Sequence, residues 1–438
     1  MKFKNILYAL CLMPYALWAQ DCATRTTVPA GELTLPEIIE LGLCRNPNTS
    51  AAFLNMRAAQ MNRNVAAGQY LPSVTASIGY QRQYRLEEWR SSQNASLSAN
   101  WLIFDFGRRY SEVAAMNHIW RATGFDYSAT TQQYIFDLIS AYYGMLGADA
   151  EVRAATELVG VARTAYQTAN TRFRAGAVAR ADVLRAETTL AQRELELQRA
   201  RGSLQIARGR LLFLLSFPQD QDLNIAQMPA EFASPEESRT ISEMIERARE
   251  RRPDLLAASA NTNAAWHRRN AAFLRNLPTI SASGNLAFNF NANYDAFGAG
   301  PDTRFDGSSI GIRASMPIFA GFANANNLRA AQFNYDRANE QLRARGDAAA
   351  MDIWSAYQNY QTARHVLSAT NALLASSQES ERVVSGMYRV GRATMLDWQT
   401  AQADLASAQR QNITARYDLF VRRASLALAM GELGPNLF

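Results

Sequence analysis

The chain has 438 residues, of which 48% are hydrophobic and 19% charged, and a formal net charge of +6. Its basic residues are scattered singly, without the aromatic interleaving of a single-strand-binding surface, so no nucleic-acid partner is expected. Beyond the N-terminal stretch, no segment approaches the roughly 18 consecutive apolar residues of a membrane-spanning helix, which excludes a bundle of such helices.

Residues 1–19 are predicted to be a signal peptide for export. Lys2 and Lys4 precede an apolar stretch that ends in the small residue Ala19, as in a cleaved secretory signal. A membrane anchor is the alternative, but the stretch is short for that role and contains Pro14. Removal of the signal takes away two lysines and no acidic residue, so the net charge of the mature chain falls to +4.

The cysteines agree with export to an oxidising compartment. Cys11 lies within the predicted signal, so the mature chain retains Cys22 and Cys44. We predict a disulfide between these two residues, with two unpaired thiols as the alternative. No small-residue lipidation motif precedes Cys22, so no lipid anchor is predicted.

Four segments alternate between apolar and small polar residues. They comprise residues 74–80, 97–103, 280–290 and 310–318. Alternation over roughly ten residues is typical of strands with lipid on one face and water on the other. A membrane-spanning sheet must hide its edges, and bacterial barrels have about eight strands or more, so several copies of the chain are expected to pool their strands.

The chain contains an internal tandem repeat. Leu71-Pro72, before the first strand, recurs 206 residues later as Leu277-Pro278, and Ile103-Phe104 recurs 215 residues later as Ile318-Phe319. The nine additional residues are predicted to lie in a loop over 291–307, which is rich in Gly, Asp and Asn. The predicted division is a signal peptide at 1–19, a first repeat at 20–230, a second repeat at 231–432 and a C-terminal tail at 433–438.

Each strand pair is followed by a stretch with almost no helix-breaking residues, which predicts one long helix in each half. These helices cover about 108–174 and about 323–389. At 1.5 Å per residue, each is on the order of 100 Å long. Gly176 and Gly391 are expected to end them, and return helices beginning near Asp182 and Asp397 complete an antiparallel hairpin in each half. Shorter helices are predicted over 35–44 and 241–250.

These elements resemble the TolC-type outer membrane efflux protein (outer membrane factor) family, the exit ducts of tripartite pumps and type I secretion systems. The resemblance extends from about Leu35 to Gly431. Its motifs are the helix break Asn46-Pro47, Leu71-Pro72 before a strand, Ile103-Phe104-Asp105-Phe106-Gly107 after one, and the turns Phe173-x-x-Gly176 and Tyr388-x-x-Gly391.

The resemblance implies a mainly α fold with a transmembrane β-barrel and an internal tandem repeat. In a homotrimer, four strands per protomer make a 12-stranded barrel in the outer membrane lipid, and long antiparallel coiled-coil helices form an α-barrel that extends into the periplasm. The helical tip then meets a periplasmic adaptor (membrane fusion) protein. The implied function is a passive exit duct for an inner membrane ABC or proton-driven transporter.

The resemblance also implies roles for residues of the two hairpin turns. Asp182 and Asp397 correspond to a periplasmic pore constriction, and their alternative role is to cap a helix N-terminus. The residues that correspond to tip closure and adaptor docking are Phe173, Gly176, Tyr388, Arg389, Gly391 and Arg392. Ordinary turn packing is the alternative for Tyr388 and Arg389. The chain departs from the family pattern at Ala393 and Thr400, where an arginine and a second acidic residue are expected.

No catalytic arrangement, metal site or cofactor site is predicted, so the chain is not expected to be an enzyme. His118, His267 and His365 lie in helical stretches without a second ligand at the spacing of three or four residues that suggests zinc. The alternatives to an exit duct are a stand-alone diffusion porin and a periplasm-spanning structural protein.

Overall fold

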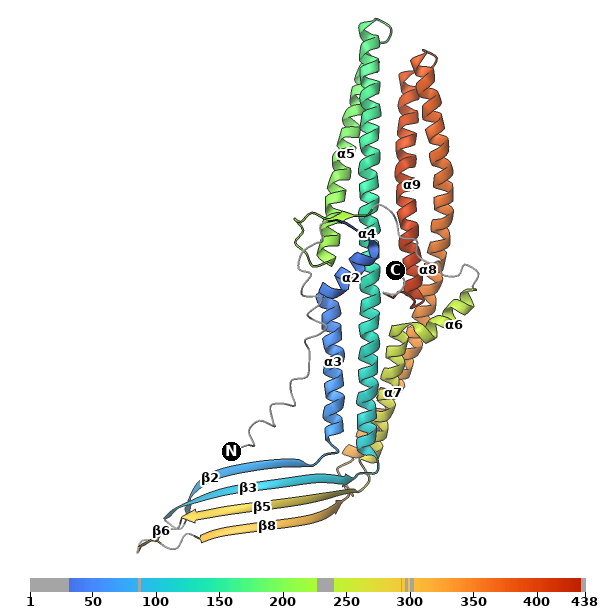
Figure 1. Cartoon of the computed structure of the whole chain (residues 1–438). Coiled ribbons are helices and arrows are strands. Elements are labelled where there is room, and N and C mark those ends of the chain that lie inside the picture. Colours follow the sequence, from blue (N-terminus) through green and yellow to red (C-terminus); the bar gives the residue numbers. More distant parts are fainter. Residues whose placement is uncertain are drawn as a thin grey trace. The chain divides into compact units, whose positions relative to one another are not determined.

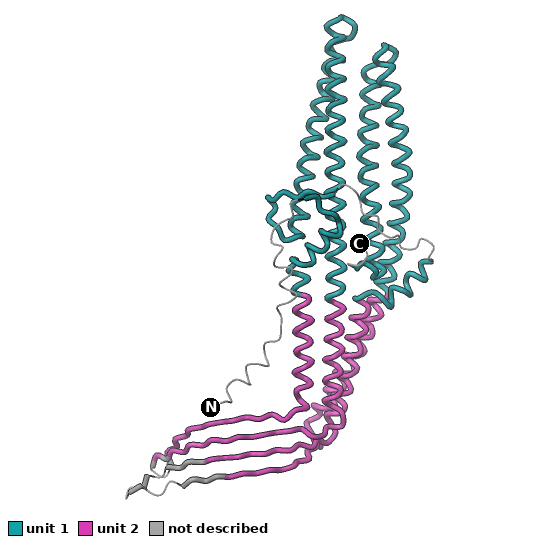
Figure 2. Tube along the Cα trace, in the orientation of Figure 1, with its two compact units in different colours: residues 1–51, 127–253, 347–438 teal, residues 52–126, 254–346 magenta. Residues whose placement is uncertain are grey.

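The computed structural model describes residues 31–85, 88–226, 240–292, 294–295, 298–299 and 303–434. The predicted signal peptide, Cys22 and residues 435–438 of the predicted tail lie outside these ranges. The chain divides into two compact units (Figure 2). Unit 1 comprises residues 1–51, 127–253 and 347–438, and unit 2 comprises 52–126 and 254–346. Each unit therefore takes segments from both halves of the sequence.

Helices of equal length occur in the two halves of the chain. The first half has α2 (Leu35–Arg45), α3 (Pro47–Gly68), α4 (Arg108–Arg174) and α5 (Arg180–Leu214), and the second has α6 (Ile241–Arg251), α7 (Pro253–Leu274), α8 (Ala323–Arg389) and α9 (Met395–Ala429). Their lengths are 11, 22, 67 and 35 residues in each half. The prediction of two long helices over 108–174 and 323–389 is confirmed. Among the described residues, no helix is both long and apolar enough to cross a membrane.

Unit 2 contains one antiparallel four-stranded sheet in the order β2-β3-β5-β8 (Figure 1). Its strands are β2 (Ser73–Arg85), β3 (Glu88–Phe104), β5 (Thr279–Ala292) and β8 (Thr303–Ser315). The register places Val74 opposite Ala99, Ala99 opposite Gly284 and Gly284 opposite Ile310. Because opposite residues share a face, the apolar residues of all four strands lie on one side of the sheet, as the alternation predicts.

The apolar face of the sheet is uncovered, since Ile78 is 90% and Ile310 93% exposed. The other face carries small hydroxyl side chains, such as Ser77 and Ser96, whose oxygens lie 2.7 Å apart. Two faces of such different polarity suit a sheet between an apolar and an aqueous phase.

Several predicted strand boundaries are wrong. The first strand extends beyond Tyr80 to Arg85, and the second begins at Glu88, well before Leu97. The predicted loop over 291–307 is much shorter, because β5 continues to Ala292 and β8 begins at Thr303, with the short strands β6 (Tyr294–Asp295) and β7 (Gly298–Ala299) between them. The fourth strand ends at Ser315 instead of Ile318. Pro317 has no backbone N–H to donate to the sheet, which accounts for this early end.

The largest core of unit 1 joins α2 to α4, α5 and α9. Gly42 of α2 lies against Tyr134 of α4, and a Cβ atom at Gly42 would be 2.6 Å from the Tyr134 hydroxyl. That hydroxyl donates a hydrogen bond of 2.8 Å to the Leu214 carbonyl, and burial raises the pKa of Tyr134 to about 12. The strands β1 (Glu32–Leu33) and β4 (Asn224–Ile225) pair in parallel beside this core.

Candidate functional site

Two helical hairpins of unit 1, α4–α5 and α8–α9, end in turns of the same kind. Gly176 and Gly391 adopt positive φ angles of 73° and 79°. In the first turn the Ala177 amide donates to the Arg172 carbonyl at 2.8 Å, and in the second the Arg392 amide donates to the Met387 carbonyl at 2.8 Å. These bonds define Schellman motifs. No atom lies within 4 Å of a Cβ at either glycine, so the backbone conformation, and not lack of space, requires glycine there.

A buried cluster joins the two hairpins near these turns. It comprises Ala165, Ala169, Ala186, Tyr388, Met395 and Trp398. The rings of Tyr388 and Trp398 lie 5.0 Å apart and are only 3% and 5% exposed. Trp398 Nε1 donates to Glu381 Oε1 at 2.9 Å, whereas the buried Tyr388 hydroxyl has no hydrogen-bond partner among the described residues. The Tyr388 ring therefore packs against residues of both hairpins, and its contacts extend beyond its own turn.

Arg172 links the first hairpin to the end of α8. Its Nη1 donates to the Tyr388 carbonyl at 2.9 Å, and its Nη2 donates to the Arg389 carbonyl. The guanidinium carbon also lies 4.9 Å from the centre of the Tyr388 ring. The last carbonyls of a helix lack intrahelical donors and carry partial negative charge, so a guanidinium at this position is favoured. Arg172 is not among the site residues predicted from the sequence.

Asp397 caps the N-terminus of α9. Its Oδ2 accepts hydrogen bonds from the Thr394 amide at 2.8 Å and from the Thr394 hydroxyl at 2.7 Å, and its own amide donates to Thr394 Oγ1 at 3.2 Å. The side-chain and backbone hydrogen bonds from Thr394 lower the pKa of Asp397. Asp397 is therefore ionised at neutral pH, and the capping role considered from the sequence is present in the single chain.

Asp182 occupies the corresponding first turn of α5 but differs in its contacts. The N-cap of α5 is Ala179, which makes no side-chain capping bond. Asp182 Oδ1 instead lies 3.6 Å from Arg185 Nη1 one turn on, and both side chains are partly exposed. Exposed ion pairs of this kind contribute about 0–1 kcal/mol, so Asp182 is held less firmly than Asp397.

Apolar side chains are exposed around both turns. They are Phe173, Leu184, Met387, Val390 and Leu396. The predicted docking residues Arg389, Gly391 and Arg392 are also exposed, whereas Tyr388 is buried. Of the predicted docking set, Tyr388 therefore belongs to the contact between the hairpins. Cys44 is disulfide-bonded. Its predicted partner, Cys22, lies outside the described residues, so the pairing of Cys22 with Cys44 stays a prediction.

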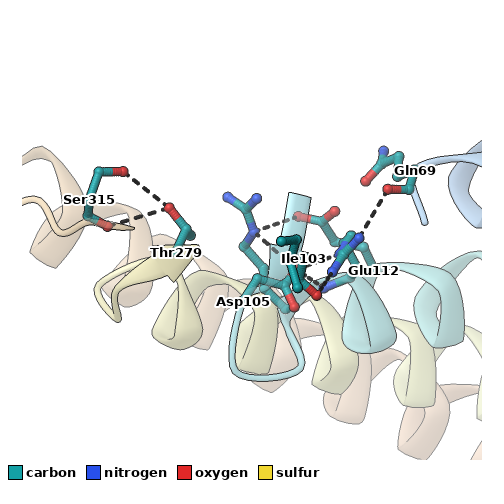
Figure 3. Close-up of polar contacts among 8 residues, drawn as sticks. Gln69, Ile103, Asp105, Glu112, Thr279 and Ser315 are labelled. Carbon is teal, nitrogen blue, oxygen red and sulfur yellow. Dashed lines mark hydrogen bonds and ion pairs between the residues drawn. The ribbon is translucent and has the colours of Figure 1, made fainter. Parts of the chain in front are cut away.

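A second polar site joins the sheet of unit 2 to α4. Asp105 and Arg109 are both buried, and Asp105 Oδ2 accepts from the Arg109 amide at 2.9 Å and from Arg109 Nε at 3.0 Å (Figure 3). The guanidinium of Arg109 also donates to the carbonyls of Gln69 and Ile103 at 3.2 and 3.1 Å. This ion pair thus connects the end of α3, the end of β3 and the start of α4.

Comparison with known proteins agrees with this arrangement. A family model described as outer membrane efflux protein matches residues 38–216 and 244–432. Protein CyaE of Bordetella pertussis is 26% identical over 411 residues, covering 92% of this chain and 85% of CyaE. Outer membrane protein TolC of Escherichia coli is 24% identical over 424 residues, covering 92% and 83%. The solved structure of VceC of Vibrio cholerae aligns with a TM-score of 0.78 at 19% identity, covering 91% of this chain and 96% of VceC.

The fold is that of outer membrane channels, as the likeness to VceC and to the outer-membrane channel OprN indicates. The chain belongs to the outer membrane efflux protein family, and it is a protein of the outer membrane. Its relatives are named as outer membrane proteins and channels instead of enzymes, so the hairpin tips and the sheet are considered below for transport and not for catalysis.

Proposed function

We propose that the chain forms a homotrimeric exit duct, which passively conducts substrate to the exterior. The four-stranded sheet is the observation that carries this proposal. Within the described residues, β2 and β8 each pair with another strand on one side only. In lipid, each unsatisfied backbone group costs several kcal/mol, so both edges need a partner. Pairing β2 of one copy with β8 of the next closes a 12-stranded barrel from three copies, within the size range of outer membrane barrels.

The two faces of the sheet fit this barrel. The exposed face that carries Ile78 and Ile310 would meet lipid, and the face that carries Ser77 and Ser96 would line the water-filled interior. The helices of about 100 Å would continue the duct into the periplasm. The energy for transport would come from an inner membrane partner, an ABC or proton-driven transporter, joined to the duct by a periplasmic adaptor in a tripartite pump or a type I secretion system.

The hairpin tips would then form the periplasmic constriction. Three copies of Asp182 and Asp397 place up to six carboxylates around one axis, where they attract cations and resist leakage of anions. The lowered pKa of Asp397 supports this role because the carboxylate keeps its charge at neutral pH. The exposed apolar residues around the turns, including Phe173, would provide the surface for the adaptor together with Gly176, Arg389, Gly391 and Arg392.

The mass of the protein extracted in mild detergent tests this proposal. A native mass of three chains is expected, with the trimer resisting dissociation because each β2 edge is paired. A single folded chain in detergent, or a stable dimer, would contradict it. Ile78→Lys introduces a charge on the lipid-facing side of β2 and should weaken the trimer. Ser77→Lys is the matched control, because it introduces the same charge on the opposite face of the same strand and should leave the trimer intact.

A further inference from the structure

Two of the three histidines of the chain meet in unit 2, although 149 residues separate them in the sequence. His118 of α4 and His267 of α7 have ring centroids 5.3 Å apart, with 22° between the ring planes. His267 Nδ1 is buried and has no hydrogen-bond partner among the described residues. Ligand spacings within one helix do not reveal this pair, because the two histidines come from different helices.

The separation of the rings matches that of two ligands on one metal ion. An imidazole nitrogen binds zinc at about 2.0–2.1 Å, so two imidazoles at a tetrahedral angle on one ion have centroids about 5 Å apart. The rings are stacked with only 22° between their planes, so each ring must turn about its side-chain bonds before both can direct a nitrogen at a shared ion.

The neutral form of imidazole binds metals, and the surroundings of both rings favour that form. Burial lowers the pKa of His118, and the charge of Arg121 lowers it further. Burial also lowers the pKa of His267, with a smaller contribution from His118.

A cavity of about 440 Å³ lies beside His267. Ser111 and Asn270 contribute polar side chains to its wall, and Tyr110 and Trp266 contribute aromatic rings. The Trp266 ring centroid lies 4.7 Å from that of His267. The cavity has room for several water molecules, whose share of liquid volume is about 30 Å³ each. Water in this cavity can therefore reach an ion bound at His267.

We propose that His118 and His267 form an open two-histidine site for a borderline divalent ion such as Zn²⁺, Ni²⁺ or Cu²⁺. Imidazole favours these ions over Mg²⁺ and Ca²⁺, which prefer oxygen ligands. Within the described ranges, no group of three or more His, Cys, Asp and Glu residues surrounds a common point. The ion would thus keep water ligands and exchange with solvent, and it would connect α4 to α7.

Binding of Cu²⁺ to the full-length, untagged protein in detergent tests this site. We expect one ion per chain and a dissociation constant that rises by about tenfold or more in His118→Gln and in His267→Gln. His365→Gln is the matched control, because His365 is exposed on α8 in unit 1, and it should bind like the unaltered protein. Equal binding by all three variants would overturn the proposal, as would no binding by the unaltered protein.

The electron paramagnetic resonance spectrum of Cu²⁺ on the unaltered protein gives an answer even if a histidine variant does not assemble. The superhyperfine splitting reports how many imidazole nitrogens bind the ion. Splitting from two nitrogens is expected. Splitting from one nitrogen, or from none, would place the ion elsewhere and refute the two-histidine site.

Discussion

The Arg172 guanidinium lies 4.9 Å from the centre of the Tyr388 ring and donates a 2.9 Å hydrogen bond to the Tyr388 carbonyl. The two residues are 216 positions apart in the sequence and belong to different hairpins. This contact therefore connects the α4–α5 hairpin to the C-terminal end of α8. In the proposed duct, the hairpins cannot separate at the tip without breaking it.

Replacement of Arg172 by alanine should favour an open tip. Hydrogen bonds of this kind contribute about 1–2 kcal/mol, which changes the ratio of closed to open states roughly 5- to 30-fold. Single-channel recording should show longer or larger openings. Arg163→Ala on the same helix is the control, because Arg163 pairs with Glu194 in an exposed ion pair and should leave the current unchanged. Equal currents from both variants would show that Arg172 does not hold the tip closed.

Asp397→Asn should weaken block of the current by divalent cations severalfold at neutral pH, because it removes one carboxylate per copy from the constriction. Since the folded-state pKa of Asp397 is lowered, its ionised form adds stability at neutral pH. That contribution is lost only as the pH falls below about 4 and through the lowered pKa. Block should follow the same titration. If Asp397→Asn and Asp182→Asn together leave block unaltered in an assembled trimer, the constriction lies elsewhere.

Thr394→Ala separates the capping role of Asp397 from its charge. The variant removes the hydroxyl that donates to Asp397 Oδ2 and accepts from the Asp397 amide, so the pKa of Asp397 should rise toward its ordinary value. The pH midpoint of divalent block should move upward with it, while block at neutral pH persists. An unmoved midpoint would mean that another group controls the titration.

Asp105→Ala should destabilise unit 2 by roughly 3–5 kcal/mol, because it leaves the buried guanidinium of Arg109 without its counter-charge. The free energy of unfolding in detergent measures this loss. Thr279→Ala is the control. Its hydroxyl lies 3.2 Å from that of Ser315 at an exposed position (Figure 3), so the change should be within about 0.5 kcal/mol. A loss at Asp105 as small as that at Thr279 would show that the ion pair does not hold the junction.

Gly391→Val should weaken binding of a periplasmic adaptor, because a β-branched residue is strained at a φ of 79° and the turn would rearrange. Gly386→Ala, one turn earlier in α8, is the control. A Cβ at Gly386 meets no atom within 4 Å, and alanine favours the helix by roughly 0.5–1 kcal/mol. Adaptor binding that survives Gly391→Val at full affinity would place the docking surface away from this turn.

The helices were predictable because residues with strong local preferences mark their ends. Pro47 and Pro253 begin α3 and α7, and Gly176 and Gly391 adopt the positive φ that ends a hairpin helix. The strand ends were less predictable. The Gly- and Asn-rich segment around Ala292 resembles a loop, but pairing of β5 with β8 extends the sheet through it.

The contacts that build the sites were not predictable from local patterns. Arg172 with Tyr388, and His118 with His267, come from helices that meet only in the folded chain. Asp105 was recognised as part of a motif, but its partner Arg109 was not. At the corresponding positions of the second repeat the chain has Ala320 and Asn324. The ion pair is therefore absent from the repeat pattern, and the sequence gives no sign of it.

A trimeric duct that is closed at its periplasmic tip should have a characteristic conductance. We would record planar-bilayer currents of the detergent-extracted protein and measure the mass of the same sample. A trimer with a small, cation-selective current that divalent ions block is expected. A large current without block would indicate a permanently open porin, and an assembled trimer without any current would indicate a structural role; neither is compatible with a duct gated at its tip.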